Sequence, residues 1–161
     1  MNAYELCQRH VVTVRRHEEV VTAAWIMRER HVGCLVVVEP LGGGTGERPI
    51  GMVTDRDIVT NVIARESDPR TVIVDDIMTR HPVSIWATTS VEDALQRMQS
   101  GGVRRVPVVD ERGRLVGILA LDDIFEHMAA RLPFAASAVR RDREPSREPP
   151  REQPREAGVM S

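Results

Sequence analysis

The pattern of hydrophobic and polar positions in this chain occurs twice. Residues 3–38 align with residues 74–109 at a constant spacing of 71, and residues 51–63 align with residues 117–129 at a spacing of 66. The chain is therefore predicted to contain a tandem structural repeat. The spacing shrinks because the first copy carries a longer segment at residues 40–49 (PLGGGTGERP), which we expect to form an exposed, flexible hairpin loop.

Each copy has the pattern of a β-α-β-β-α unit. Short extended segments at 11–14 and 83–85 precede amphipathic stretches that predict helices over about 19–30 and 91–100. The expected core-facing residues of these helices are Val20, Ala24 and Met27 in the first copy and Val91, Leu95 and Met98 in the second. The second helix has an expected N-cap, formed by Ser90 and Asp93.

The strands that follow are short and rich in β-branched residues. Residues 35–38 and 106–109 have the composition of buried strands, and Gly113 is typical of a hairpin turn. Pro107 cannot donate a hydrogen bond to a neighbouring strand, so we expect it to lie at an open edge of the sheet or at a strand entry. The two cysteines, Cys7 and Cys34, stand among apolar residues and are predicted to be buried free thiols, with a redox pair as the alternative.

Composition sets the domain organisation. With 161 residues and 42% apolar content, the chain can form one compact unit from both copies. The predicted boundaries are a first motif at 3–65, a linker at 66–73, a second motif at 74–132 and a disordered tail at 133–161, which is rich in Pro, Arg and Glu. The net charge of -2, without a basic run, argues against nucleic-acid or membrane partners. No apolar stretch is long enough for a membrane span or a signal peptide, which predicts a cytoplasmic protein.

Candidate chemistry lies where residues 51–54 run into the next helix. Thr54 and Asp57 place a hydroxyl and a carboxylate at the helix start, which suits a hydroxyl-rich, anion-bearing ligand. The same two residues also fit a capping box, which needs no ligand. In the second copy Asp123 keeps the carboxylate, whereas Ala120 takes the place of the threonine. The sequence thus predicts one good site and one poorer site.

These residues carry a resemblance to a known family. The segments DIMTRHPVSI, VRRVPVVDERGRLVGILALDDI and GMVTDRDIV resemble the motif of CBS (cystathionine-β-synthase) domains, over roughly residues 3–131. The chain is most similar to stand-alone bacterial two-CBS proteins of the hypoxic-response type. The resemblance implies an α/β (α+β) fold in which two β-α-β-β-α motifs pack with pseudo-twofold symmetry into one CBS pair. It also implies two clefts for adenosine-containing effectors, such as AMP, ADP, ATP or S-adenosylmethionine, with no required cofactor.

The resemblance also implies which residues contact the ligand. One cleft would hold Thr54 and Asp57 and be closed by Val83 and Ser84 of the second copy. The other would hold Asp123 and be closed by Val12 and Thr13 of the first copy, so each cleft draws on both copies. Arginines in the second copy stand where the family contacts phosphates, namely Arg104 and Arg105.

Three functional hypotheses are compatible with these patterns. The first is a regulatory module that senses an adenosine nucleotide and signals to an unknown protein partner. The second is a ligand-free interaction or stress protein in which Thr54 and Asp57 only cap a helix. The third is a metal or redox sensor that uses His10, His81, Cys7 and Cys34, although no further ligand recurs at coordinating spacing, so we expect no metal site. We expect no enzymatic activity, because no Gly-x-Ser-x-Gly, Walker or His-Glu-x-x-His motif occurs.

The first long helix also predicts a homodimer. Val21 and Trp25 form an apolar stripe beside the core-facing one, whereas the second copy has Glu92 and Gln96 at these positions. An exposed valine and tryptophan would be unusual on a monomer. The alternative is that this helix is buried more deeply against the adjoining repeat.

Overall fold

The computed structural model describes residues 1–131. The predicted tail at 133–161 lies outside these residues. Within the described part of the chain, every helix is too short or too polar to cross a bilayer.

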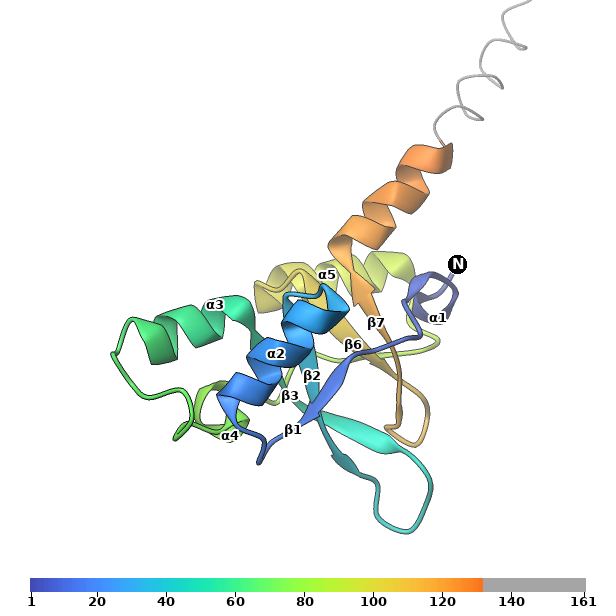
Figure 1. The fold of residues 1–161 in the computed structure, drawn as a ribbon. Helices are drawn as coiled ribbons and strands as arrows, with labels where there is room; N and C mark the ends of the chain where they lie inside the picture. Colours follow the sequence, from blue (N-terminus) through green and yellow to red (C-terminus); the bar gives the residue numbers. More distant parts are fainter. Residues whose placement is uncertain (132–161) are drawn as a thin grey trace, which may run out of the picture. The chain divides into compact units, whose positions relative to one another are not determined.

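Both repeats have the predicted β-α-β-β-α order, each preceded by a short helix that the sequence pattern did not indicate (Figure 1). The first repeat comprises α1 (Ala3–Leu6), β1 (Thr13–Arg15), α2 (Val20–Arg30), β2 (Cys34–Pro40), β3 (Glu47–Thr54), α3 (Asp55–Ile58) and the π-helix η1 (Val59–Ile63). The second comprises α4 (Val74–Ile77), β4 (Thr79–Arg80), β5 (Ile85–Trp86), α5 (Val91–Gly101), β6 (Arg105–Val109), β7 (Leu115–Ala120) and a helix that is described over 121–131.

The strands form two small mixed sheets. One has the order β1-β2-β3-β4 and the other β5-β6-β7. In both sheets the first strand runs parallel to the second, and the second pairs with the third in an antiparallel hairpin. Strand β4 belongs to the second repeat by sequence but pairs with β3 of the first repeat, with Gly51 opposite Arg80.

The two repeats exchange their first segments. Ala3 of α1 is fully buried in the core of the second repeat, where its N–H donates to the Thr89 carbonyl at 2.8 Å. At the equivalent position, Val74 of α4 is buried in the core of the first repeat and donates to the Glu18 carbonyl at 2.9 Å. Each hydrophobic core is therefore completed by the other repeat.

The long helices contact the cores through slightly different faces from those predicted. In α2 the predicted core residues Val20 and Met27 are buried, but the third buried residue is Ala23, whereas Ala24 is exposed. In α5 Val91 and Met98 are buried as predicted, but the third buried residue is Ala94, and Leu95 is only half-buried. An alanine at this position of each helix lets the helix approach its sheet closely. The predicted cap of α5 is confirmed, because the Ser90 hydroxyl accepts a hydrogen bond from Asp93 N–H at 3.1 Å.

Of the two places predicted for Pro107, the sheet edge was wrong, because its strand β6 is the middle strand of its sheet. A strand entry fits its pairing with β5, which begins one residue later. In the first repeat, Val36 N–H donates to the Val12 carbonyl at 3.2 Å. Pro107 is the equivalent of Val36 and has no N–H to donate, so the parallel pairing of β5 with β6 begins only at Ile85 opposite Val108. The sheet tolerates the proline because the hydrogen-bonded pairing between β5 and β6 does not include Pro107.

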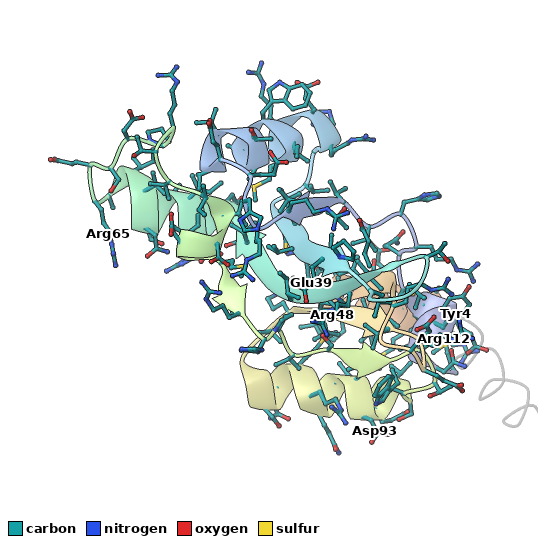
Figure 2. All side chains as sticks on the ribbon, turned by 90° about the horizontal axis from the view of Figure 1, so that it is seen from below. Tyr4, Glu39, Arg48, Arg65, Asp93 and Arg112 are labelled. Atoms are coloured by element: carbon teal, nitrogen blue, oxygen red, sulfur yellow. The ribbon has the colours of Figure 1, made fainter. Side chains whose placement is uncertain are left out.

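The glycine-rich loop is shorter than predicted. Strand β2 extends to Pro40 and β3 begins at Glu47, so the unpaired loop covers only residues 41–46. Glu39 and Arg48 lie opposite each other in this hairpin and form an ion pair (Figure 2). Cross-strand pairing of opposite charges supports the extension of the two strands.

Candidate ligand-binding clefts

Two cavities of similar size lie at positions related by the repeat spacing. Cleft 1 has a volume of about 480 Å³ and is lined by Cys34, Met52, Thr54, Arg56, Asp57, Thr79, His81, Pro82, Val83, Gly101, Gly102, Val103, Arg104 and Arg105. Cleft 2 has a volume of about 420 Å³ and is lined by Gln8, His10, Val11, Val12, His31, Val32, Gly33, Cys34, Arg105, Ile118, Ala120, Asp122 and Asp123. Both volumes suit a small molecule of nucleoside size.

The carboxylate of cleft 1 is fixed by the start of α3. Thr54 is the N-cap, and its hydroxyl accepts a hydrogen bond from Asp57 N–H at 3.2 Å. The Asp57 Oδ2 atom in turn accepts from Thr54 N–H and from the Thr54 hydroxyl, both at 2.8 Å. The capping box is therefore present, and it holds the Asp57 side chain in one orientation.

The capping box leaves half of this carboxylate available. A carboxylate offers about four acceptor positions, two on each oxygen. Both donors from Thr54 bind Oδ2, and no described residue donates to Oδ1 of Asp57. Two acceptor positions remain, which matches the two O–H groups of a cis-diol. The capping and ligand-binding interpretations of this residue pair are thus compatible.

The equivalent carboxylate in cleft 2 is held differently. Asp123 Oδ2 accepts from Ala120 N–H at 3.1 Å, and no hydroxyl is available at this position. Its Oδ1 atom lies 3.5 Å from the Gln8 side-chain amide, which partly occupies the acceptor that stays free in Asp57. The equivalent of Gln8 in cleft 1 is Thr79, a shorter side chain.

Two of the four residues expected to close the clefts line them, and two do not. Val83 lies in cleft 1 with Thr54 and Asp57, and Val12 lies in cleft 2 with Asp123. Ser84 is absent from the residues that line cleft 1, and its hydroxyl donates to the Pro82 carbonyl at 3.1 Å. Thr13 likewise lies outside cleft 2 and borders a separate surface hollow.

The two adjacent arginines have different environments. Arg104 lines cleft 1 and forms an ion pair with Asp122 at 3.0 Å. Arg105 lines both clefts, and among the described residues no carboxylate pairs with it. Of these two arginines, Arg105 is therefore the one whose guanidinium group is available to a ligand.

The prediction that Cys34 lies in the core was wrong, whereas the prediction for Cys7 is confirmed. Cys7 is buried in the core of the second repeat. Cys34 is only half-buried and lines both clefts, because β2 begins at the point where the two repeats meet. Desolvation raises the pKa of the Cys34 thiol to about 11, Arg105 opposes this shift, and Asp57 and Asp55 add to it.

Sequence reasoning missed several residues that line the clefts, among them Arg56. Arg56 follows Asp55 in the first turn of α3 and reaches cleft 1. Its equivalent in the second repeat, Asp122, reaches cleft 2. The repeat spacing of 66 already pairs these two positions in the sequence, so comparing the copies charge by charge would have singled them out.

The histidines considered as a symmetric metal pair lie in different cavities. His81 lines cleft 1, whereas His10 lines cleft 2. Over residues 1–131, no three His, Cys, Asp or Glu side chains come together in an arrangement that would hold a metal ion.

Comparison with known proteins identifies the family that this fold and these clefts define. The sequence matches the CBS domain family over residues 3–64 and 74–130. The chain therefore belongs to the CBS domain family and contains a CBS pair. Almost all of the described residues fall within these two matches, and the described part of the chain contains no additional domain.

Several relatives match along most of the chain. Hypoxic response protein 1 of Mycobacterium tuberculosis is 36% identical over 126 residues, which cover 78% of this chain and 84% of that protein. An uncharacterised protein of Methanopyrus kandleri, MK0525, is 34% identical over 122 residues, which cover 76% of this chain but only 60% of that protein. The chain is thus homologous to a stand-alone CBS protein.

Solved structures show the same fold. The crystal structure of hypoxic response protein I with two coordinated zinc ions has a TM-score of 0.68 and 35% identity, and the match covers 79% of this chain and 98% of that one. A hexameric CBS-CP12 protein from bloom-forming cyanobacteria has a TM-score of 0.66 and 32% identity over 78% of this chain and 70% of that one. The CBS pair of MJ0100, in complex with 5'-methylthioadenosine and S-adenosylmethionine, has a TM-score of 0.69 over 81% of this chain and 98% of that one. At 22% identity, the last comparison bears on the fold alone.

Proposed function

We propose that this CBS pair is a regulatory module that binds an adenosine-containing ligand in cleft 1. The observation that carries this proposal is the free Oδ1 atom of Asp57, which is held by the capping box at the wall of a cavity of about 480 Å³. A fixed carboxylate with two unused acceptor positions is complementary to the 2'- and 3'-hydroxyls of a ribose.

The remaining walls of cleft 1 suit the other parts of such a ligand. Met52, Val83 and Val103 offer apolar surface for a purine ring. Arg105 offers a guanidinium group to a phosphate. The complex of the MJ0100 CBS pair with two adenosine compounds supports the proposal at the level of the fold.

Regulation requires that the ligand favours one arrangement of the protein over another. Cleft 1 draws residues from both repeats, such as Asp57 and Val83, so an occupant contacts both at once. A ligand with different affinity for two arrangements of the repeats shifts their populations, and a protein partner can recognise the difference.

Thermal unfolding with a panel of compounds tests the proposal. The panel contains adenosine, AMP, ADP, ATP, S-adenosylmethionine, NADH and Zn²⁺. At a hundred times its Kd, a ligand stabilises the native state by about 2.7 kcal/mol, which raises the Tm of a chain of this size by roughly 5 to 10 °C. Stabilisation by Zn²⁺ alone would favour the metal-sensor hypothesis, and no response to any compound would favour a ligand-free interaction protein.

We further propose that the protein is a homodimer through helix α2. Trp25 is 61% exposed and Val21 is 39% exposed, so the adjoining repeat does not cover them. The π-helix η1, which follows α3, also exposes Val59 and Ile63. A second copy of the chain would remove these apolar side chains from water, and the hexameric relative supports the association of CBS proteins with one another.

A further inference from the structure

The two clefts differ in charge at one pair of equivalent positions. Each is the second residue of the helix that follows the last strand of its repeat: Arg56 in the first repeat and Asp122 in the second. Both residues are exposed. Arg56 lines cleft 1, and Asp122 lines cleft 2. Helical geometry therefore presents a guanidinium group to one cavity and a carboxylate to the other.

The other ionised residues increase this difference. Cleft 1 contains three arginines and one aspartate, namely Arg56, Arg104, Arg105 and Asp57. Cleft 2 contains one arginine and two aspartates, namely Arg105, Asp122 and Asp123. Counted by formal charge at neutral pH, cleft 1 is therefore cationic and cleft 2 is more acidic.

The ion pair between Arg104 and Asp122 reduces this difference, because it neutralises one cation of cleft 1 and one anion of cleft 2. It leaves Arg56 and Arg105 with Asp57 in cleft 1, and Arg105 with Asp123 in cleft 2. It joins a residue of cleft 1 to a residue of cleft 2 at 3.0 Å, with both side chains more than half exposed. The equivalent of Arg104 in the first repeat is Gly33, so cleft 2 has no cation at that position. An added side chain there would be crowded, because a Cβ atom on Gly33 would lie 2.9 Å from the Asp55 Oδ2 atom.

We infer that the two clefts select ligands by charge: cleft 1 accepts adenosine ligands that carry a phosphate, whereas cleft 2 rejects phosphate and accepts only uncharged or cationic adenosine ligands. This inference rests on the proposed function and assigns a ligand class to each site. Guanidinium groups bind phosphate through charge-assisted hydrogen bonds, whereas a nearby carboxylate that lacks a matching free cation repels it. Arg105 lines both clefts and does not distinguish them, so the cation that distinguishes cleft 1 is Arg56, which forms no ion pair with a described residue.

Charge exchange between the equivalent positions tests the inference. Calorimetry measures the binding of AMP and adenosine to the wild type, Arg56→Asp and Asp122→Arg. Both changes are at exposed positions of helices, so they keep the fold. The matched control is Arg65→Asp, which changes the net charge equally at an exposed position that lines neither cleft (Figure 2).

We expect the wild type to bind one AMP per chain. In Arg56→Asp, the ratio of the AMP affinity to the adenosine affinity falls ten-fold or more. In Asp122→Arg, a second AMP site is added. Arg65→Asp changes neither quantity by more than about two-fold, the range expected for a remote charge under salt screening. Two AMP sites in the wild type, or equal ratios in Arg56→Asp and Arg65→Asp, would overturn the inference.

Inorganic pyrophosphate separates this inference from the proposed function, because it carries the charge without the adenosine. If AMP and adenosine both fail to bind but pyrophosphate raises the Tm of the wild type and not that of Arg56→Asp, the adenosine assignment is wrong and the charge selectivity stands. If pyrophosphate acts equally on the two proteins, the charge selectivity is wrong as well.

Discussion

Cys34 and Arg105 occupy equivalent positions in the two repeats, and both side chains line both clefts. They begin the middle strands of their sheets, β2 and β6, at the place where the repeats meet. The two repeats therefore differ at this position, where the first has a thiol and the second has a guanidinium group. Any compound that fills either cavity changes the surroundings of both residues.

The first prediction concerns the reactivity of Cys34. Burial raises the pKa of this thiol to about 11, compared with about 8.5 for an exposed cysteine. At pH 8 we expect iodoacetamide to alkylate Cys34 roughly ten- to a hundred-fold more slowly in the folded protein than in the protein unfolded by guanidinium chloride. Peptide mass spectrometry distinguishes Cys34 from Cys7.

Arg105→Ala provides the matched variant for this measurement. Arg105 lowers the pKa of Cys34, so its removal slows alkylation further at a fixed pH.

The same pKa shift makes stability depend on pH. Because the folded state keeps the thiol proton between pH 8.5 and 11 while the unfolded chain releases it, stability should fall as the pH rises through this window. An alkylation midpoint near pH 8.5 in the folded protein would show that the thiol is solvated.

The second prediction concerns the ribose contact. Asp57→Ala should weaken binding of an adenosine ligand ten-fold or more, since loss of charge-assisted hydrogen bonds costs on the order of 1.5 to 3 kcal/mol. Asp123→Ala should have a smaller effect, because the Gln8 amide lies 3.5 Å from its Oδ1 atom and competes with a ligand. Calorimetry on both variants compares the clefts directly, and equal losses would refute the asymmetry.

Loss of the capping box in Asp57→Ala also destabilises helix α3, and Ser90→Ala controls for this. Ser90 caps α5 through the same N–H contact but lines neither cleft. We expect Ser90→Ala to cost about 1 kcal/mol of stability and to leave ligand affinity unchanged. If affinity fell equally in both variants, the effect of Asp57→Ala would reflect stability and not ligand contact.

The third prediction concerns the ion cluster that ties α4 to the first repeat. Hydrogen bonds from Arg80 and then Arg16 lower the pKa of Asp75, at distances of 2.8 and 3.0 Å. The stabilisation is present above the ordinary pKa of an aspartate, about 3.9, and is lost as the pH falls through the lower folded value. Asp75→Asn should therefore lower the Tm at pH 6 and reduce its dependence on pH below 4.

Thermal unfolding between pH 2 and 6 measures this effect, with Glu111→Gln as an exposed acidic control. Glu111 forms no ion pair with any described residue. The control should keep the acid sensitivity of the wild type. An unchanged acid transition in Asp75→Asn would mean that the cluster contributes little to folding.

The fourth prediction concerns association. Trp25→Glu should give a folded monomer, because a charge in the middle of an apolar contact is costly to desolvate. Light scattering reports the mass, and circular dichroism reports the helices. Glu92 is the exposed residue of α5 that is equivalent to Val21, and Glu92→Ala should stay dimeric. A dimeric Trp25→Glu protein would place the interface elsewhere, and an unfolded one would show that Trp25 supports the fold.

The sequence predicted those features that depend on local pattern and on the repeat register. The strand and helix order follows from apolar periodicity, and the cap at Ser90 follows from side-chain chemistry within one turn. The middle-strand position of Pro107 could not be predicted, because it depends on where the pairing of β6 with β5 begins, which the sequence does not show. The exposure of Cys34 was missed for a similar reason, since the apolar residues around it in sequence are not those around it in space.

The cleft residues show the same limit. Thr54 and Asp57 are three residues apart, so their hydrogen bonds could be inferred from the sequence alone. The contribution of Gln8 to cleft 2 depends on a contact with Asp123, 115 residues away. Contacts at such separations leave no periodic pattern in a single sequence.

The exchange of first segments has a consequence for synthesis on the ribosome. Gln8 pairs with Ile118, and Ala3 is buried in a core that includes Leu119. Residues 3–8 therefore lack these partners until more than a hundred further residues have been added. At about 5 to 20 residues per second this takes roughly 5 to 20 s. The core of the first repeat is likewise incomplete until Val74 and Met78 have been added. We therefore expect the two repeats to complete their cores only after β7 has been synthesised.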